Sequence, residues 1–212
     1  MVMAPRVRAL SLTAHVSTSL GWLGAVATFL AMAIVGLARH DTEIVRSMYV
    51  AMNVTTWVVI VPLCLAALVT GVIQSLGTPW GLFRHCWVVV KLALTLLATV
   101  VLFIHTQPID RVAQVALAGS LDGGTLWSVR LQLIGDASAA LAVLMVTTAL
   151  SVYKPWGLTP YGIRRQFEDT NGRALVSSRR ARPAGRYVLI AIGAFVAVIV
   201  LLHLFGIGLH AH

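Results

Sequence analysis

Residues 87–105 read WVVVKLALTLLATVVLFIH, and Lys91 and the closing His105 are the only ionisable side chains in this stretch. A helix that crosses a hydrocarbon layer of about 30 Å needs about 20 mostly apolar residues. The stretch shows no alternation of apolar and polar side chains, which argues against a strand of a membrane barrel. Because lipid offers no hydrogen bonds to the backbone, an apolar run of this length predicts a transmembrane helix.

The rest of the chain has the same apolar character. Of its 212 residues, 58% are apolar and 11% are charged, and the formal net charge is +9. A soluble domain carries about 25% charged residues, so the composition excludes a water-soluble globule. The apolar excess excludes a disordered chain, and two cysteines are too few for a secreted disulfide scaffold. The composition therefore indicates a membrane protein.

Five apolar stretches are long enough to cross a membrane. They cover residues 9–38, 50–76, 86–104, 131–153 and 187–209. The sequence thus predicts an all-α polytopic membrane protein in which residues 1–153 form a core bundle of four helices. Residues 154–186 form a basic loop, and residues 187–212 hold the fifth transmembrane helix and a short outer tail. Pro62 lies in the middle of the second stretch and predicts a kink, because proline removes a backbone donor.

The distribution of basic residues predicts the orientation in the membrane, because basic segments resist translocation. With the N-terminus inside, the inner segments carry eleven Lys and Arg residues and the outer segments carry four. We therefore expect a cytoplasmic N-terminus and an outer C-terminus. Eight of the eleven inner residues lie in the loop 154–186, which its prolines and glycines predict to be largely irregular.

The basic loop also predicts a partner. Basic side chains next to a membrane are attracted to anionic headgroups, so membrane lipids are the expected partner of residues 154–186. Nucleic-acid binding would need a row of stacking aromatic side chains, and Tyr161 and Phe167 are too few for it. We expect no nucleic-acid partner.

Cysteine and tryptophan positions fit the same topology. Cys64 is expected near mid-membrane and Cys86 near the inner face, so the two should not form a disulfide. Tryptophans gather at membrane interfaces, where their amphipathic rings anchor a helix. The tryptophans expected in this belt are Trp22, Trp57, Trp80, Trp87 and Trp127.

Ionisable side chains within a span cost about 2.5–3.5 kcal/mol at mid-bilayer and are candidates for function. An inner layer of such polar residues contains His15, Gln74 and Lys91, with His85 at its mouth. The inner halves of the predicted spans contain no Asp or Glu, so Lys91 has no carboxylate partner there. Two alternatives follow. The amine acts as a ligand or proton carrier, or its stem extends and places the ammonium among the headgroups.

An outer polar layer lies near the opposite face. Its members are Asn53, Asp136 and His203, with His105 and His40 near the boundary. Asp136 and His203 have matching depths, so we expect them to be in contact. Such a contact is either a polar clasp between helices or a proton relay that can also flank a cofactor. Lys91 and His105 share one helical stripe about 21 Å apart, a spacing suited to two haems in transmembrane electron transfer.

Two segments resemble a known group of bacterial membrane proteins. HVSTSLGWLG, residues 15–24, and the stretch 87–105 resemble the first and third helices of this group. The group includes the haem-binding membrane protoporphyrinogen oxidase and the copper-resistance D membrane proteins, and the resemblance covers about residues 9–106. Segments 77–91 (GTPWGLFRHCWVVVK) and 151–162 (SVYKPWGLTPYG) resemble uncharacterised integral membrane proteins of bacteria. The resemblance implies a location in the bacterial plasma (inner) membrane.

The resemblance also implies a cofactor. A first-helix histidine, a third-helix lysine and a closing histidine belong to the haem-associated pattern of the oxidase family, and His15, Lys91 and His105 match it. It implies haem b with His15 and Lys91 as inner axial ligands and His85 as a substitute for either. His105 or His203 would be the outer ligand, tuned by Asp136. The haem iron is the only metal expected.

The implied function is transmembrane electron transfer or a membrane redox reaction. If the chain is an enzyme, it is a haem-dependent oxidoreductase with a redox partner or a second copy of itself. Two alternatives stay open: a proton or metal-ion transporter that uses the same polar residues, and a non-catalytic scaffold or accessory subunit. The positions of His15, Lys91 and Gln74 relative to one another discriminate between them.

Overall fold

The computed structural model describes residues 3–78, 81–119, 124–154 and 157–169. These residues form helices and no named strand, as expected for an all-α protein. The helices are α1 (Pro5–Ala38), α2 (Thr42–Thr55), the π-helical turn η1 (Thr56–Ile60), α3 (Val61–Leu76), α4 (Cys86–Leu117), α5 (Gly124–Tyr153) and α6 (Pro160–Asp169). The predicted fifth span, with His203, lies outside the described residues.

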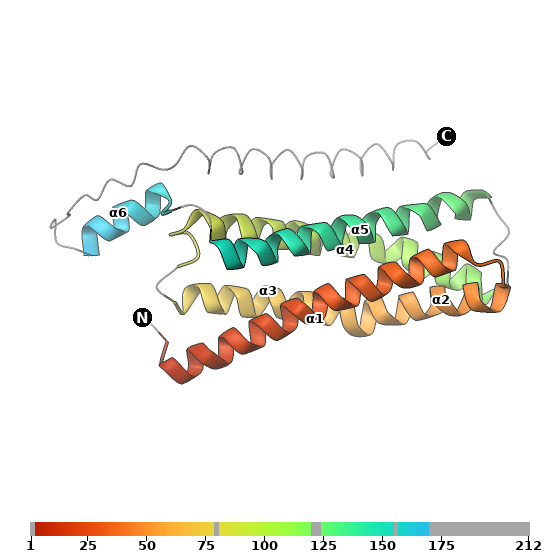
Figure 1. The fold of residues 1–212 in the computed structure, drawn as a ribbon, viewed down its shortest axis with the longest axis horizontal. Coiled ribbons are helices and arrows are strands. Elements are labelled where there is room, and N and C mark those ends of the chain that lie inside the picture. Colours follow the sequence, from red (N-terminus) through yellow and green to blue (C-terminus); the bar gives the residue numbers. More distant parts are fainter. Residues whose placement is uncertain (1–2, 79–80, 120–123, 155–156, 170–212) are drawn as a thin grey trace.

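Four helices are long and apolar enough to cross a membrane: α1, the continuous helix Thr42–Leu76, α4 and α5. They run side by side along one axis, with α2 and α3 end to end in the second span (Figure 1). α1 packs against α2, α3 and α5, and α4 packs against α2 and α5. We call the end of this assembly that holds the start of α1 the Pro5 end, and the opposite end the Ala38 end.

α4 is longer than the hydropathy of its sequence predicts. The apolar stretch ends at residue 104, but the helix continues through Pro108 to Leu117. Ile109, Val112 and Ala116 are buried at helical spacing against the neighbouring helices. Hydropathy identifies the part of a helix that lipid can surround. Packing against the neighbouring helices stabilises the helical residues beyond that part.

The irregularity of the second span lies next to the proline that predicts a kink. The irregular turn η1 precedes Pro62, and Pro62 lies in the first turn of α3. The helix is continuous across η1 and α3, so the absent N–H of Pro62 leaves a carbonyl of the preceding turn without that donor, and the wide turn η1 accommodates the loss. The irregular turn η1 therefore lies just before Pro62, the residue from which the kink was predicted.

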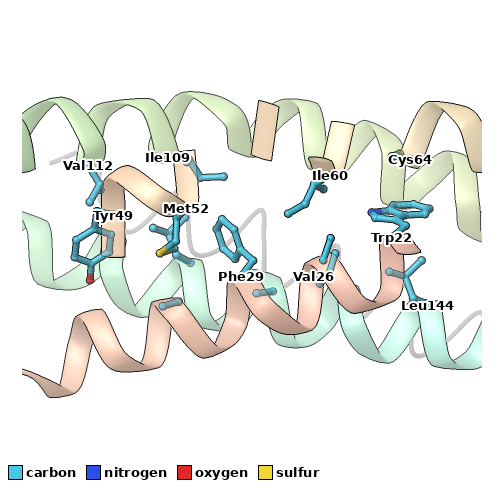
Figure 2. Close-up of a cluster of buried hydrophobic side chains, with 14 of the residues drawn as sticks. Trp22, Val26, Phe29, Tyr49, Met52, Ile60, Cys64, Ile109, Val112 and Leu144 are labelled. Atoms are coloured by element: carbon cyan, nitrogen blue, oxygen red, sulfur yellow. The ribbon is translucent and has the colours of Figure 1, made fainter. Parts of the chain in front are cut away.

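A continuous apolar core lies between the four long helices (Figure 2). α1 contributes Trp22, Val26 and Phe29, and the second span contributes Met52 and Cys64. Trp22 is only 4% exposed, so the prediction that it anchors an interface is wrong. Its position seven residues after His15 puts both side chains on the face of α1 that meets the other helices. Cys64 and Cys86 are both free, as predicted.

The start of the basic loop is ordered where irregular structure was expected. α6 occupies Pro160–Asp169, with proline at its first position, where proline is favoured. The Thr159 N–H donates to the Arg84 carbonyl at 2.8 Å, and the Thr159 hydroxyl donates to the Phe83 carbonyl at 2.6 Å. Gly162 packs so closely on this segment that a Cβ atom there would overlap the Arg84 carbonyl.

Gly162→Ala should therefore detach α6 from the segment before α4. The added Cβ meets backbone rather than a movable side chain, and such overpacking costs about 1–3 kcal/mol. Limited trypsin digestion of the purified protein measures this as faster cleavage after Arg164 and Arg165. Gly157→Ala is the matched control, because a Cβ there meets nothing within 4 Å. Equal cleavage rates in the two variants would contradict the packing described.

Candidate functional site

Four helices bring polar side chains together toward the Pro5 end. The Lys91 ammonium on α4 donates to the Ser151 hydroxyl on α5 at 2.7 Å, and its Nζ lies 3.3 Å from His15 Nε2 on α1. His15 Nδ1 lies 3.1 Å from both the Ala67 carbonyl and the Thr70 hydroxyl on α3. We call His15, Thr70, Lys91 and Ser151 the His15–Lys91 cluster.

The hydrogen-bond partners assign the protons in this cluster. With Lys91 as an ammonium, which only donates, His15 Nε2 accepts from it and the ring proton is on Nδ1. Nδ1–H then donates to the Ala67 carbonyl or to Thr70, whose own hydroxyl donates to the Ala66 carbonyl at 2.6 Å. The imidazole is therefore neutral, with its basic nitrogen directed at the lysine.

The position of the imidazole depends on a glycine. A Cβ atom at Gly71 would lie 2.9 Å from His15 Cε1, closer than such atoms approach in proteins. The ring of His15 thus occupies the space that any other residue at this position would fill. Thr18, one turn along α1, lies 3.4 Å from the Thr70 hydroxyl and continues the polar contact between α1 and α3.

Lys91 is held among the helices. Its side chain is partly buried, and its amine contacts His15 and Ser151. Within the described ranges, no carboxylate forms an ion pair with Lys91. Of the two alternatives that the sequence left open, the contacts agree with an amine inside the protein and disagree with one extended to the headgroups. A cation at this depth without a countercharge is costly.

Two further oxygen atoms lie near the cluster without partners. Ser11 Oγ, one turn before His15, and Gln74 Oε1, one turn after Thr70, are buried and accept or donate no hydrogen bond. Gln74 was predicted in the same layer as Lys91, but the contacts of Lys91 do not include it. Buried polar atoms of this kind are usually satisfied by water.

A second titratable pair lies farther along α4. His105 Nε2 is 3.0 Å from Asp136 Oδ2 on α5, and His105 Nδ1 is 2.6 Å from the Val101 carbonyl. The His105 side chain is 7% exposed and that of Asp136 is 19% exposed. The partner expected for Asp136 was His203, which lies outside the described residues. The carboxylate instead meets an imidazole from the neighbouring helix.

Asn53 bonds to a carboxylate that the sequence did not single out. Its side-chain amide donates to Asp110 Oδ1 at 2.5 Å, and the Trp57 indole N–H donates to the same oxygen at 3.0 Å. Asp110 lies six residues beyond the apolar stretch that ends at 104, so the search for polar residues within spans missed it. Asp110 lies five residues after His105, where the predicted span had already ended, so no other feature of the sequence pointed to it as a polar partner.

The two remaining histidines in the described residues lie near helix ends. His85 is the residue before α4, and its ring lies 6.5 Å from that of Trp87. Its backbone forms an isolated bridge with Leu158. His40 lies in the turn between α1 and α2. His85 is not among the contacts of His15 or Lys91, so its role as a substitute ligand stays a prediction.

The His15–Lys91 cluster does not fit a haem between its two nitrogens. Metal–nitrogen bonds are about 2 Å long, so two axial ligands lie about 4 Å apart with the macrocycle between them. His15 Nε2 and Lys91 Nζ are 3.3 Å apart and in direct contact. In the parts of the chain that the structure describes, no group of three His, Cys, Asp or Glu side chains could hold a metal ion.

Comparisons with protein-family models, with curated proteins and with solved structures found no match to this chain. The likeness to the oxidase and copper-resistance group therefore stays a prediction from two segments.

Ser151→Ala should destabilise the protein, because it removes one acceptor from the buried ammonium of Lys91. Loss of one partner from a buried polar group costs about 1–3 kcal/mol. Lys91→Met should be neutral or stabilising, because an apolar side chain replaces a buried charge. In the double variant, Ser151→Ala should then cost less than it does alone. Thermal unfolding in detergent measures all four proteins, and a neutral Ser151→Ala would contradict the contact.

Proposed function

We propose that this chain is an integral membrane protein that conducts protons along the interface of α4 and α5. The contact between Lys91 and His15 carries the proposal. Two basic nitrogens at hydrogen-bond distance share one proton, and no described carboxylate neutralises it. A structural clasp of equal strength needs only neutral side chains, and interhelical contacts of that kind are common. The cost of burying an amine points to chemistry that needs it.

The proposal takes the four long helices as the core bundle and residues 187–209 as a fifth span. With the predicted orientation, the Pro5 end faces the cytoplasm of a bacterial cell. The basic residues of 154–186 then lie at the inner leaflet, where anionic headgroups attract them. Protons would leave at the Pro5 end, where Ser11 and Gln74 place buried oxygens without protein partners.

Hydroxyl groups follow α4 between the two titratable clusters. Thr95 and Thr99 come four and eight residues after Lys91 and therefore lie on the same face. Each donates to the carbonyl one turn before it, at 2.9 and 2.8 Å, which leaves its oxygen able to accept a further proton donor. The Thr99 hydroxyl also lies 3.2 Å from the Cys64 thiol. Across the interface, α5 presents Ser151 opposite Lys91 and Asp136 opposite His105.

The cluster atoms define the first transfer. The proton leaves Lys91 Nζ for His15 Nε2, which gives a neutral amine and an imidazolium whose Nδ1–H stays on the Ala67 carbonyl. The neutral amine can then take a proton from the opposite side of the cluster. At the far end, His105 Nε2 and Asp136 Oδ2 lie 3.0 Å apart, close enough to exchange a proton. A proton-conducting path would need water to bridge these hydroxyls.

The same geometry argues against the two other hypotheses that involve a metal. Two axial ligands or two metal ligands must keep their lone pairs free and stay apart, whereas these nitrogens point at each other. A shared proton is what this arrangement holds. If the polar residues of the two clusters tolerate substitution, their role is purely structural.

Proton flux into liposomes tests the proposal. Protein reconstituted with an internal pH-sensitive dye should acidify the lumen when a potassium diffusion potential is imposed. Lys91→Met and Asp136→Asn should each lower the rate by about a hundredfold, the usual effect of removing a proton-transfer group. Glu43→Gln and Arg6→Gln are the controls, because their exposed side chains lie outside both clusters.

Two results would contradict proton conduction. One is wild-type flux in both Lys91→Met and Asp136→Asn. The other is a haem band in the reduced-minus-oxidised spectrum that disappears in Lys91→Met, which would favour the haem hypothesis. The spectrum is recorded on protein expressed with ample haem.

A further inference from the structure

A pocket of about 300 Å³ lies at the Ala38 end of the helices, away from both titratable clusters. The end of α1 and the start of α2 form one wall, and the end of α4 and the first turns of α5 form the other. Arg39, His40 and Arg130 line it, with Thr42, Val45 and Trp127. Among the described residues that line it, there is no carboxylate.

The basic side chains of this pocket have no opposing charge. In the described residues, neither Arg39, His40 nor Arg130 forms an ion pair with a carboxylate. Asp41 is next to His40 in sequence, but its Oδ1 accepts the backbone N–H groups of Glu43 and Ile44 at 3.0 and 3.2 Å. Asp41 therefore caps α2 and does not line the pocket. The described side chains that line the pocket thus include two permanent positive charges, those of Arg39 and Arg130.

Arg130 is held in place by buried groups. Its Nε donates to the Tyr49 hydroxyl at 2.6 Å, and its Nη2 donates to the Gly36 carbonyl. The guanidinium also lies over the Tyr49 ring, 5.3 Å from the ring centre. Tyr49 is 2% exposed, and a Cβ atom at Gly36 would lie 3.1 Å from its ring. Glycine at position 36 thus permits the approach of tyrosine that supports the arginine.

These contacts use two of the five N–H donors of the guanidinium. The remaining donors keep a fixed direction, because the fork is planar and is anchored on one side. A planar, preorganised guanidinium matches the oxygens of phosphate and binds them with charge-assisted hydrogen bonds. The exposed side chain of Arg39 adds a second charge at the mouth of the pocket.

We infer that this pocket binds a phosphate group, either the headgroup of an anionic phospholipid or free phosphate. Both sources present the same charged oxygens to Arg130 and Arg39. The pocket lies where α1 ends and α5 begins, and membrane-spanning helices end at headgroup depth. Val45 and the exposed ring of Trp127 add apolar surface beside the basic groups, which suits the glycerol and upper acyl chain of a lipid.

The experiment uses the full-length protein in nanodiscs at constant ionic strength. In one arm, inorganic phosphate is titrated into protein in phosphatidylcholine nanodiscs, and binding is followed by ³¹P line broadening. In the other arm, nanodiscs contain a fraction of phosphatidylglycerol, and native mass spectrometry counts the phosphatidylglycerol that stays bound. The pocket variants are Arg130→Lys, which keeps the charge and loses the anchored fork, and Arg39→Gln. Arg111→Gln is the control, an exposed arginine of α4 outside the pocket.

Both pocket variants should weaken binding by about tenfold or more, and the control should change it by less than about twofold. Weakened phosphate binding identifies the free anion as the ligand, and weakened phosphatidylglycerol retention identifies the lipid headgroup. Arg39→Gln keeps the result interpretable if Arg130→Lys fails to fold, because the Arg39 side chain is exposed and forms no hydrogen bond with the described residues. Equal loss in Arg111→Gln, or no loss of either probe in the pocket variants, would overturn the inference.

Discussion

The cost of placing an ammonium group among membrane-spanning helices governs the Pro5 end of this protein. Lys91 is satisfied by one hydroxyl and one imidazole nitrogen, so α1 and α5 must both approach α4 at the same depth. The imidazole in turn must present Nε2, which it does because Nδ1 is held by α3. Gly71 provides the space for the ring. A single costly charge thereby sets the relative positions of all four spans.

The His105–Asp136 pair and the His15–Lys91 cluster stabilise their buried ionisable side chains in different ways. His105 and Asp136 have opposite charges when both are ionised, and each can also be neutral, so the pair tolerates several protonation states. The His15–Lys91 cluster contains bases alone, which meet at hydrogen-bond distance. Arg130 follows a third solution, in which an aromatic ring and a carbonyl support a permanent cation at the edge of the assembly. The basic side chains of Lys91, His105 and Arg130 therefore each have a different kind of partner, which indicates a different function for each.

Hydropathy was sufficient to predict the helical class, four of the spans and the polar layer around His15 and Lys91. It could not predict which side chains meet, because a contact depends on how each helix is rotated and tilted against its neighbours. Asp110 illustrates the limit, since it lies past the apolar stretch but within the packed helix. Trp22 was assigned to an interface by residue type, yet the face of α1 that it shares with His15 is buried. Partners such as Tyr49 for Arg130 come from distant sequence and have no local signature.

The π-helical turn in the second span has a consequence for phase. Met52 and Cys64 are both fully buried in the same core, although they are twelve residues apart. In a regular α-helix that separation rotates one side chain about 120° from the other. One additional residue in a wide turn removes about 100° of this rotation and leaves the two nearly aligned. Thr56 and Ile60, which lie between them, are buried at successive spacings of four. Buried residues that recur every four positions would therefore indicate an inserted residue in other long helices as well.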